Sequence, residues 1–257
     1  MSTRDHTFSV DGTPSLSIRM PLGEVRIVDG APGEVAVRLD GRDSAIARFI
    51  VEQRGDEIVI EPDGSSRGWR SSVDLTVRVG TPPRVSGRLA ASDLNAGVPL
   101  RELTVDSAAG DISTRDIGGD ATIRTASGDV RIGDVAGALE VTTASGDVRA
   151  GTVERDVLTR TASGDVRIGS VAGDVTGKSA SGDVQISQFT GSSLDLTTLS
   201  GEATVGVTSG RTFEVDLQTL SGEVRTDFPV SGSAPGGSTA RLSIKTISGD
   251  IEIRAAT

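Results

Sequence analysis

The segment DVRIGDVAGALEVTTASGDVRAGTVERDVLTRTASG, residues 129–164, decides the fold because it repeats one nine-residue pattern without a gap. The tripeptide Ser-Gly-Asp recurs every 18 residues, at 127–129, 145–147, 163–165 and 181–183. Ten nine-residue units cover residues 102–191 in the same way. A fixed short period is typical of stacked repeats in which each unit contacts its neighbours.

Each nine-residue unit has the alternation of a strand with one buried face. Its second and fourth residues are apolar, as in Val130 and Ile132, and their neighbours are polar. We expect the seventh residue, such as Val135 or Ala144, to turn inward at a corner. The ninth is usually glycine, which allows the backbone conformations of a tight corner. The pattern predicts an all-β fold, a parallel β-solenoid with two nine-residue units in each 18-residue coil, right-handed by the usual rule for crossovers.

The columns of equivalent residues change toward the end of the chain. Ala126, Ala144, Ala162 and Ala180 occupy the seventh position, and the corresponding later residues are Leu199, Leu220 and Ile247. The interval between the Ser-Gly glycines also grows, from 18 residues to 19, 21 and 27 at Gly201, Gly222 and Gly249. Both trends predict a cross-section that widens toward the C-terminus.

The first hundred residues follow the repeat only in part. We expect residues 1–100 to form a β-rich cap and residues 101–257 the solenoid. Residues 14–40 resemble degenerate outer coils, including Glu34–Leu39. Phe49–Val51 and Glu57–Ile60 are expected to pair as a hairpin, and Val73–Val79 is the clearest strand outside the repeat. No helix is predicted, and Ala90–Ala96 forms at most one turn.

The composition excludes several classes of protein. The formal net charge is −10, which disfavours binding to nucleic acid or anionic membranes. There is no cysteine, and therefore neither a disulfide nor a thiolate metal site. The N-terminal residues lack the apolar run of a signal peptide, and no stretch reaches the roughly 18 apolar residues of a membrane span. These features predict a cytoplasmic protein, or one at the cell surface if the sequence is part of a longer chain.

A column of carboxylates is the first candidate for chemistry. Its members follow the corner glycines: Asp111, Asp129, Asp147, Asp165, Asp183, Glu202, Glu223 and Asp250. Stacked carboxylates repel each other by about 1 kcal/mol per pair in water. Arg131, Arg149 and Arg167 lie two residues further along the chain, so mutual neutralisation is the main interpretation. A row of calcium sites is the alternative, although each unit here has one glycine and lacks the ligand-rich turn of calcium-binding nine-residue repeats.

A ladder of hydroxyl groups is the second candidate. It comprises Thr125, Thr143, Thr161, Ser179, Thr198, Thr219 and Thr246, beside Ser127, Ser145, Ser163, Ser181, Ser200, Ser221 and Ser248. We expect these hydroxyls to satisfy each other and the corner backbone. The alternative is a flat polar face that receives a sugar polymer or a partner strand.

No set of residues typical of an enzyme is evident. The single histidine, His6, is expected in a solvated N-terminal tail, and no nucleophile motif or phosphate-binding loop is present. We therefore predict a non-enzymatic protein with no catalytic, cofactor-binding or metal-binding residues and no cofactor. A glycan-active β-helix enzyme that uses carboxylates alone remains an alternative.

The strand Val73–Val79 and the phrases Thr125–Ile132 and Thr161–Ile168 resemble the bacterial β-strand-repeat family of unknown function known by the name "putative adhesin". The resemblance covers nearly the whole chain. It implies a fold and a role as a surface or scaffold protein, and it implies no catalytic residue. The predicted function is a non-enzymatic scaffold or adhesin-like binding protein for a protein or cell-surface glycan. The alternative is an intracellular scaffold or acidic decoy for a basic partner.

The last strand of the sequence, Asp250–Arg254, is expected to be the open edge of the solenoid. Open strand edges pair with other chains unless something covers them. The segment Ser231–Thr239 could serve as that cover, but it is glycine-rich and has no large apolar side chain. We therefore expect self-association or partner binding through the C-terminal edge strand.

Overall fold

The computed structural model describes residues 2–64, 69–208, 212–227 and 239–256, and their regular secondary structure is β-strand except for one short helix. The chain divides into two compact units, Met1–Gly133 and Asp134–Thr257. Both are built of parallel coils, as the 18-residue period predicts. The prediction of an all-β parallel solenoid is confirmed. Its handedness and the boundary at residue 100 stay predictions.

The first unit combines an antiparallel part with the first parallel coils. Strand β3 lies between β1 and β6 and is antiparallel to both, and β4 and β5 form the expected hairpin. Strand β2 pairs in parallel with β7, β5 and β6, and β7 continues the stack to β8 and β9. The elements are β1 (Ser2–Ser9), β2 (Ser15–Asp29), β3 (Glu34–Gly41), α1 (Asp43–Ile46), β4 (Phe49–Arg54), β5 (Glu57–Pro62), β6 (Val73–Val79), β7 (Arg84–Ala96), β8 (Glu102–Ala109), β9 (Ile112–Thr114), β10 (Ala121–Ser127) and β11 (Val130–Ile132).

Two expectations for the first unit are wrong. Glu34–Leu39 is not a degenerate coil, because β3 runs antiparallel to its neighbours. Ala90–Ala96 is not a helical turn but part of strand β7, in which Leu94 and Ala96 are buried and their neighbours exposed. Alternating burial overrides the helix propensity of alanine here. The short helix α1, which buries Ala45 and Ile46, was not predicted.

The second unit consists of coils with one even-numbered and one odd-numbered strand each. The even-numbered strands pair in the spatial order β12, β14, β16, β18, β22, β20, and the odd-numbered strands in the order β13, β15, β17, β19, β23, β21. Their bounds are β12 (Leu139–Ser145), β13 (Val148–Val153), β14 (Val157–Ser163), β15 (Val166–Val171), β16 (Val175–Ser181), β17 (Val184–Phe189), β18 (Ser193–Ser200), β19 (Ala203–Val207), β20 (Thr212–Ser221), β21 (Val224–Thr226), β22 (Thr239–Ser248) and β23 (Ile251–Ala255).

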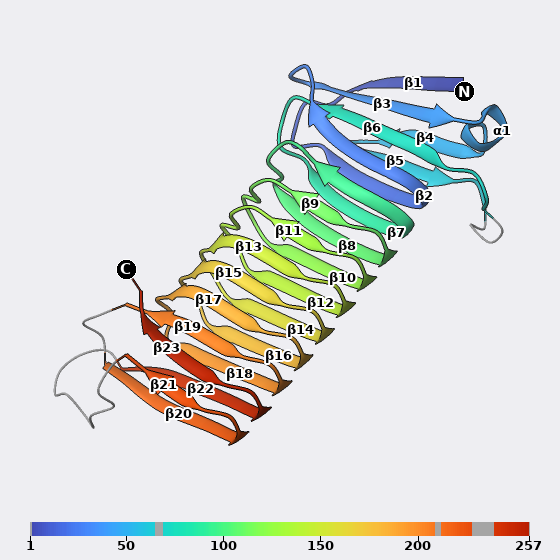
Figure 1. Ribbon diagram of the computed structural model, residues 1–257. Helices are drawn as coiled ribbons and strands as arrows, with labels where there is room; N and C mark the ends of the chain where they lie inside the picture. Colours follow the sequence, from blue (N-terminus) through green and yellow to red (C-terminus); the bar gives the residue numbers. More distant parts are fainter. Residues whose placement is uncertain (1, 65–68, 209–211, 228–238, 257) are drawn as a thin grey trace. The chain divides into compact units, whose positions relative to one another are not determined.

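The last coil in the sequence is not the last coil in space. Strands β22 and β23 lie between the coil of β18 and β19 and the coil of β20 and β21 (Figure 1). The expectation that Asp250–Arg254 forms the open edge is therefore wrong, because β23 pairs with a strand on each side. The segment Ser231–Thr239, considered as a possible cover for that edge, lies outside the described residues except for Thr239 at the start of β22.

The glycine intervals do not by themselves measure the width of a coil, so the predicted widening stays a prediction. Strands β20 and β22 have ten residues each, and β12, β14 and β16 have seven. Strands β18, β22 and β20 pair one to one, with Thr198 opposite Thr246 and Thr246 opposite Thr219. After β18 the chain does not form the adjacent strand of the stack but the one beyond it, β20. The adjacent position is then occupied by β22. The longer interval before Gly249 thus measures the path of the chain and not the perimeter of a coil.

The core confirms the inward positions of each strand and corrects one corner. Leu139, Val141 and Val148 are buried, as the alternation predicts. At the corner after each odd-numbered strand the seventh residue is also buried, as in Val153. Ala144, by contrast, is exposed, because the alternation continues through the buried Thr143 and the chain turns only at Gly146, whose φ is 124°. The whole alanine column is therefore on the outside: Ala126, Ala144, Ala162 and Ala180.

Candidate functional site

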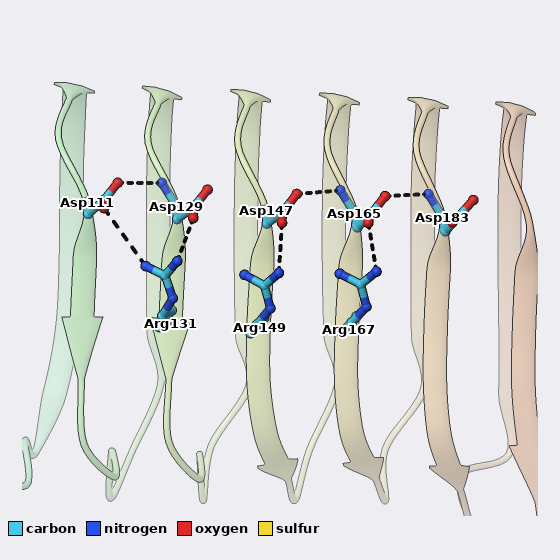
Figure 2. A network of polar contacts seen from close by, with 8 residues as sticks. All are labelled: Asp111, Asp129, Arg131, Asp147, Arg149, Asp165, Arg167 and Asp183. Atoms are coloured by element: carbon cyan, nitrogen blue, oxygen red, sulfur yellow. Dashed lines mark hydrogen bonds and ion pairs between the residues drawn. The ribbon is translucent and has the colours of Figure 1, made fainter.

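The acidic column joins each coil to the next through the corner backbone. In the second unit the Asp165 N–H donates to Asp147 Oδ1 at 3.0 Å, and the Asp183 N–H donates to Asp165 Oδ1 at the same distance (Figure 2). In the first unit the Asp129 N–H donates to Asp111 Oδ1 at 2.9 Å. A buried or half-buried amide without an acceptor is costly, so the regular aspartates satisfy the backbone of the corners.

The arginine column holds the second oxygen of the same carboxylates. Arg149 lies 2.8 Å from Asp147 Oδ2, and Arg167 lies 2.8 Å from Asp165 Oδ2 (Figure 2). The Asp165 N–H, and with it Arg149, holds the pKa of the Asp147 carboxyl below its ordinary value. The interpretation as mutual neutralisation is confirmed for these pairs, and for Arg131 with Asp129 at 2.6 Å.

The calcium alternative finds no support in this geometry. Among the described residues, no group of three or more histidine, aspartate or glutamate side chains is arranged to hold a metal ion. The column is instead a line of single carboxylates, of which Asp147 and Asp165 each accept from a backbone amide and a guanidinium.

A second ladder of aspartates, at the opposite corner, was missed in the sequence. Asp156 Oδ1 accepts from the Asp174 N–H at 2.9 Å, and Asp174 Oδ1 accepts from the Ser193 N–H at 2.9 Å. These aspartates begin a nine-residue unit, as Asp147 does, but no Ser-Gly pair precedes them. In the sequence this ladder is marked by an aspartate at the first position of the nine-residue unit, and not by the tripeptide Ser-Gly-Asp.

The hydroxyl ladder is part of the interior. Thr143, Thr161 and Thr198 are buried, and their hydroxyls donate to the carbonyl oxygens of the serines two residues on, at 3.0, 3.2 and 3.3 Å. The expectation that these hydroxyls satisfy the corner backbone is confirmed for these threonines. The neighbouring serines are exposed, so only they are available to a ligand.

An apolar stripe runs along the outside of the last three coils of the second unit. Leu199 on β18, Ile247 on β22 and Leu220 on β20 are neighbours in register, and their side chains are 49%, 51% and 83% exposed. The same column holds Ala180 on β16, which is adjacent to Leu199. Four of the five large apolar side chains exposed among the described residues belong to these coils, the fourth being Val224 on β21. Contiguous exposed apolar surface of this kind marks interaction sites.

A shallow polar groove crosses the odd-numbered strands of the same unit. Its volume is about 470 Å³, and Gly151, Gly169 and Gly206 form part of its floor. Gly206 is required by the stacking itself, because a Cβ there would lie 1.9 Å from the Ser187 carbonyl oxygen. The polar side chains around it come from Thr152, Ser170, Gln185, Ser187, Gln188, Thr204 and Arg254. Arg254 is the one charged residue among the described residues of the lining, and it pairs with Glu252 at 2.5 Å.

The comparison with protein families decides the affiliation of the chain. The family model described as Toastrack DUF4097 matches residues 84–254, which is well over half of the sequence. This chain belongs to the Toastrack DUF4097 family. The resemblance to a bacterial β-strand-repeat family of unknown function is thereby confirmed. The comparison with curated proteins finds no match.

Several solved structures are similar to this Toastrack chain over nearly its full length. A "putative adhesin" from Parabacteroides distasonis is 10% identical, with a TM-score of 0.46, and the match covers 98% of this chain and 97% of the other. A "putative adhesin" from Bacteroides fragilis is 13% identical, with a TM-score of 0.44, and coverage of 98% and 97%. One from Parabacteroides merdae is 10% identical, with a TM-score of 0.43, and coverage of 98% and 95%.

Two further findings concern His6 and the helices of this Toastrack chain. His6 is not in a solvated tail, as expected, but in strand β1, where its ring stacks on Phe8 at 6.1 Å between centroids. Burial lowers the pKa of His6. Within the described ranges, no helix has the length and apolar character needed to cross a membrane.

Proposed function

We propose that this chain is a non-enzymatic binding scaffold whose terminal coils, formed by β18 to β23, engage a protein partner. The observation that carries the proposal is the apolar stripe of Leu199, Ile247 and Leu220. Burying one such side chain stabilises a complex by about 1.5–3 kcal/mol. The stripe lies outside the core, since Leu199, Ile247 and Leu220 are exposed and the inward positions beside Leu199 and Ile247 hold the buried Thr198 and Thr246.

The order of the stripe along the stack supports recognition of a macromolecule. The column is alanine in the middle coils and becomes leucine or isoleucine only in the last three. A solenoid that needed this corner only for folding would accept alanine throughout, as the middle coils do. The large side chains are therefore an addition to the repeat at one place.

The acidic-decoy alternative draws less support from the geometry. A decoy for a basic partner needs free carboxylates, but Asp147 and Asp165 each accept from a backbone amide and an arginine. The same engagement disfavours a carboxylate pair acting as acid and base. Successive carboxylates of the column lie one coil apart, and neither a decoy nor an acid–base pair requires that spacing.

A surface glycan in the polar groove is the second candidate, favoured by the hydroxyl and amide lining. An uncharged, hydrogen-bonding ligand matches that lining better than an ion does. A Ser187→Trp variant fills the groove without touching the stripe. Loss of binding on a glycan array in this variant, with full binding by the L220A variant, would favour the glycan over the protein partner.

Site-specific photocrosslinking tests the protein-partner proposal. A photoreactive side chain in place of Leu220 should give covalent adducts with a protein in extracts of the native cell. The same side chain in place of Ala162, in the alanine part of the same column, should give none. Equal yields at both positions, or no adduct at either, would contradict the proposal.

A further inference from the structure

Among the residues that the structure describes, the coil of β20 and β21 is paired along one edge only. Strand β20 pairs with β22, and β21 pairs with β23. Across the part of the chain that the structure describes, no strand pairs along their other edges. An unpaired edge presents a row of N–H and C=O groups that can accept a further strand.

The core behind this edge is only partly covered. Val215 and Leu217 on β20 point inward but are half-buried, whereas their partners on β22, Leu242 and Ile244, are 0% exposed. On β21, Val224 is 45% exposed, and its partner Ile251 is 0% exposed. The occupant of the edge must therefore supply apolar side chains at the spacing of a strand, as another coil would.

A symmetric contact, in which the same surface of two copies meets itself, is a closed way to pair this edge. Most soluble homo-oligomers associate with closed symmetry of this kind.

The charge pattern of β20 fits such a contact. In an antiparallel pair of β20 strands centred on Leu217, Leu217 faces Leu217 of the second copy and Val215 faces Thr219. On the outer side Asp216 faces Gln218, which can donate to it as it does within the strand at 2.9 Å. Glu214 faces Leu220, so no carboxylate opposes another carboxylate.

From these observations we infer that two copies of this chain associate tail to tail through β20, with a twofold axis at Leu217. The inference rests on the proposed function, because it names a second copy as the partner of the terminal coils. The contact completes the half-covered core and satisfies the open edge, and it closes without leading to a filament.

Cysteine crosslinking reads out both the contact and its register, because the chain has no cysteine of its own. Directly opposed residues in an antiparallel pair have Cα atoms about 4.5–5.5 Å apart, which suits a disulfide. Leu217→Cys at the axis should oxidise rapidly to a disulfide-linked dimer. Val215→Cys, which faces Thr219 and not itself, and Ala162→Cys, away from the edge, should stay monomeric under the same conditions.

Light scattering during size-exclusion chromatography gives the second readout. The wild-type chain should have the mass of two copies, and Leu217→Lys, which places two cations at the axis, should have the mass of one. A monomeric wild-type chain, or equal disulfide formation in all three cysteine variants, would overturn the inference. If adducts still formed at position 220 with a different protein, the proposed function would stand and only the second copy would be wrong.

Discussion

The middle coils of the second unit, β12 to β17, and its terminal coils, β18 to β23, use the same corner in different ways. In the middle coils an aspartate and an alanine recur at fixed positions, and in β13 and β15 an arginine follows two residues after the aspartate and pairs with it. In the terminal coils the alanine becomes leucine or isoleucine, and Glu202 and Glu223 replace the aspartate. Strict repetition thus marks what the fold needs, and departures from it mark surfaces available for other roles.

The largest expected difference between the two regions is the loss of stability when a carboxylate is placed at an inward position of each. Val166→Asp in β15 buries an unpaired charge, because Val166 is 2% exposed. It should lower the free energy of unfolding by at least about 4 kcal/mol. Val215→Asp in β20 should cost only about 1 kcal/mol, since its side chain is half-buried at the open edge. Urea unfolding of dilute protein measures both, and equal losses would mean that the terminal coil is covered.

A smaller difference is expected for the acidic column. Asp165→Ala removes the acceptor of the Asp183 N–H and the partner of Arg167. It should cost about 1–2 kcal/mol in thermal or urea unfolding. Glu223→Ala should change stability little, because Glu223 is 69% exposed and pairs with Arg225 on its own strand. The comparison fails if Glu223→Ala is the more damaging change.

The smallest effect is the dependence of stability on pH and salt. The pKa values of Asp147 and Glu252 lie below their ordinary values, through the Asp165 N–H and Arg254 respectively. A lowered folded-state pKa adds stability that is complete above the unfolded pKa, about 4, and is lost as the pH falls through the folded value. Asp147→Asn and Glu252→Gln should each flatten the loss of stability below about pH 4. In about 0.5 M salt only the effect of Glu252→Gln should disappear, because an exposed ion pair is screened and a backbone hydrogen bond is not.

The sequence was sufficient for the repeat but not for the places where the chain departs from it. Alternation and the glycine period located the strands and the inward positions of Leu139, Val141 and Val148, because these depend on local geometry. The column of Ala144 was misplaced because a single extra strand residue, Thr143, turns inward before the corner. The position of the corner depends on which residue adopts a positive φ, here Gly146, and periodicity alone does not identify that residue.

The candidate surfaces were predicted less well than the fold. The pairs of aspartate and arginine followed from their spacing of two residues. The open edge was assigned to Asp250–Arg254 because sequence order was taken as spatial order. Registers such as Thr198 with Thr246 depend on pairing between distant residues, and all candidate coils share the Thr-x-Ser-Gly phrase. Strands with the same phrase can exchange levels without any mismatch in the core.

This exchange of levels has a consequence for folding during synthesis. A ribosome delivers the chain from its N-terminus, so each middle coil can add to a finished stack as soon as it emerges. Strands β20 and β21 emerge before β22 and β23, which carry every strand pairing that anchors them. Until residue 255 has been made, that coil must wait without its template or pair provisionally with β18 and β19, whose Thr-x-Ser-Gly phrase it matches. The last step of folding is therefore either the addition of β20 and β21 to the finished coil of β22 and β23, or the insertion of β22 and β23 between two coils already paired.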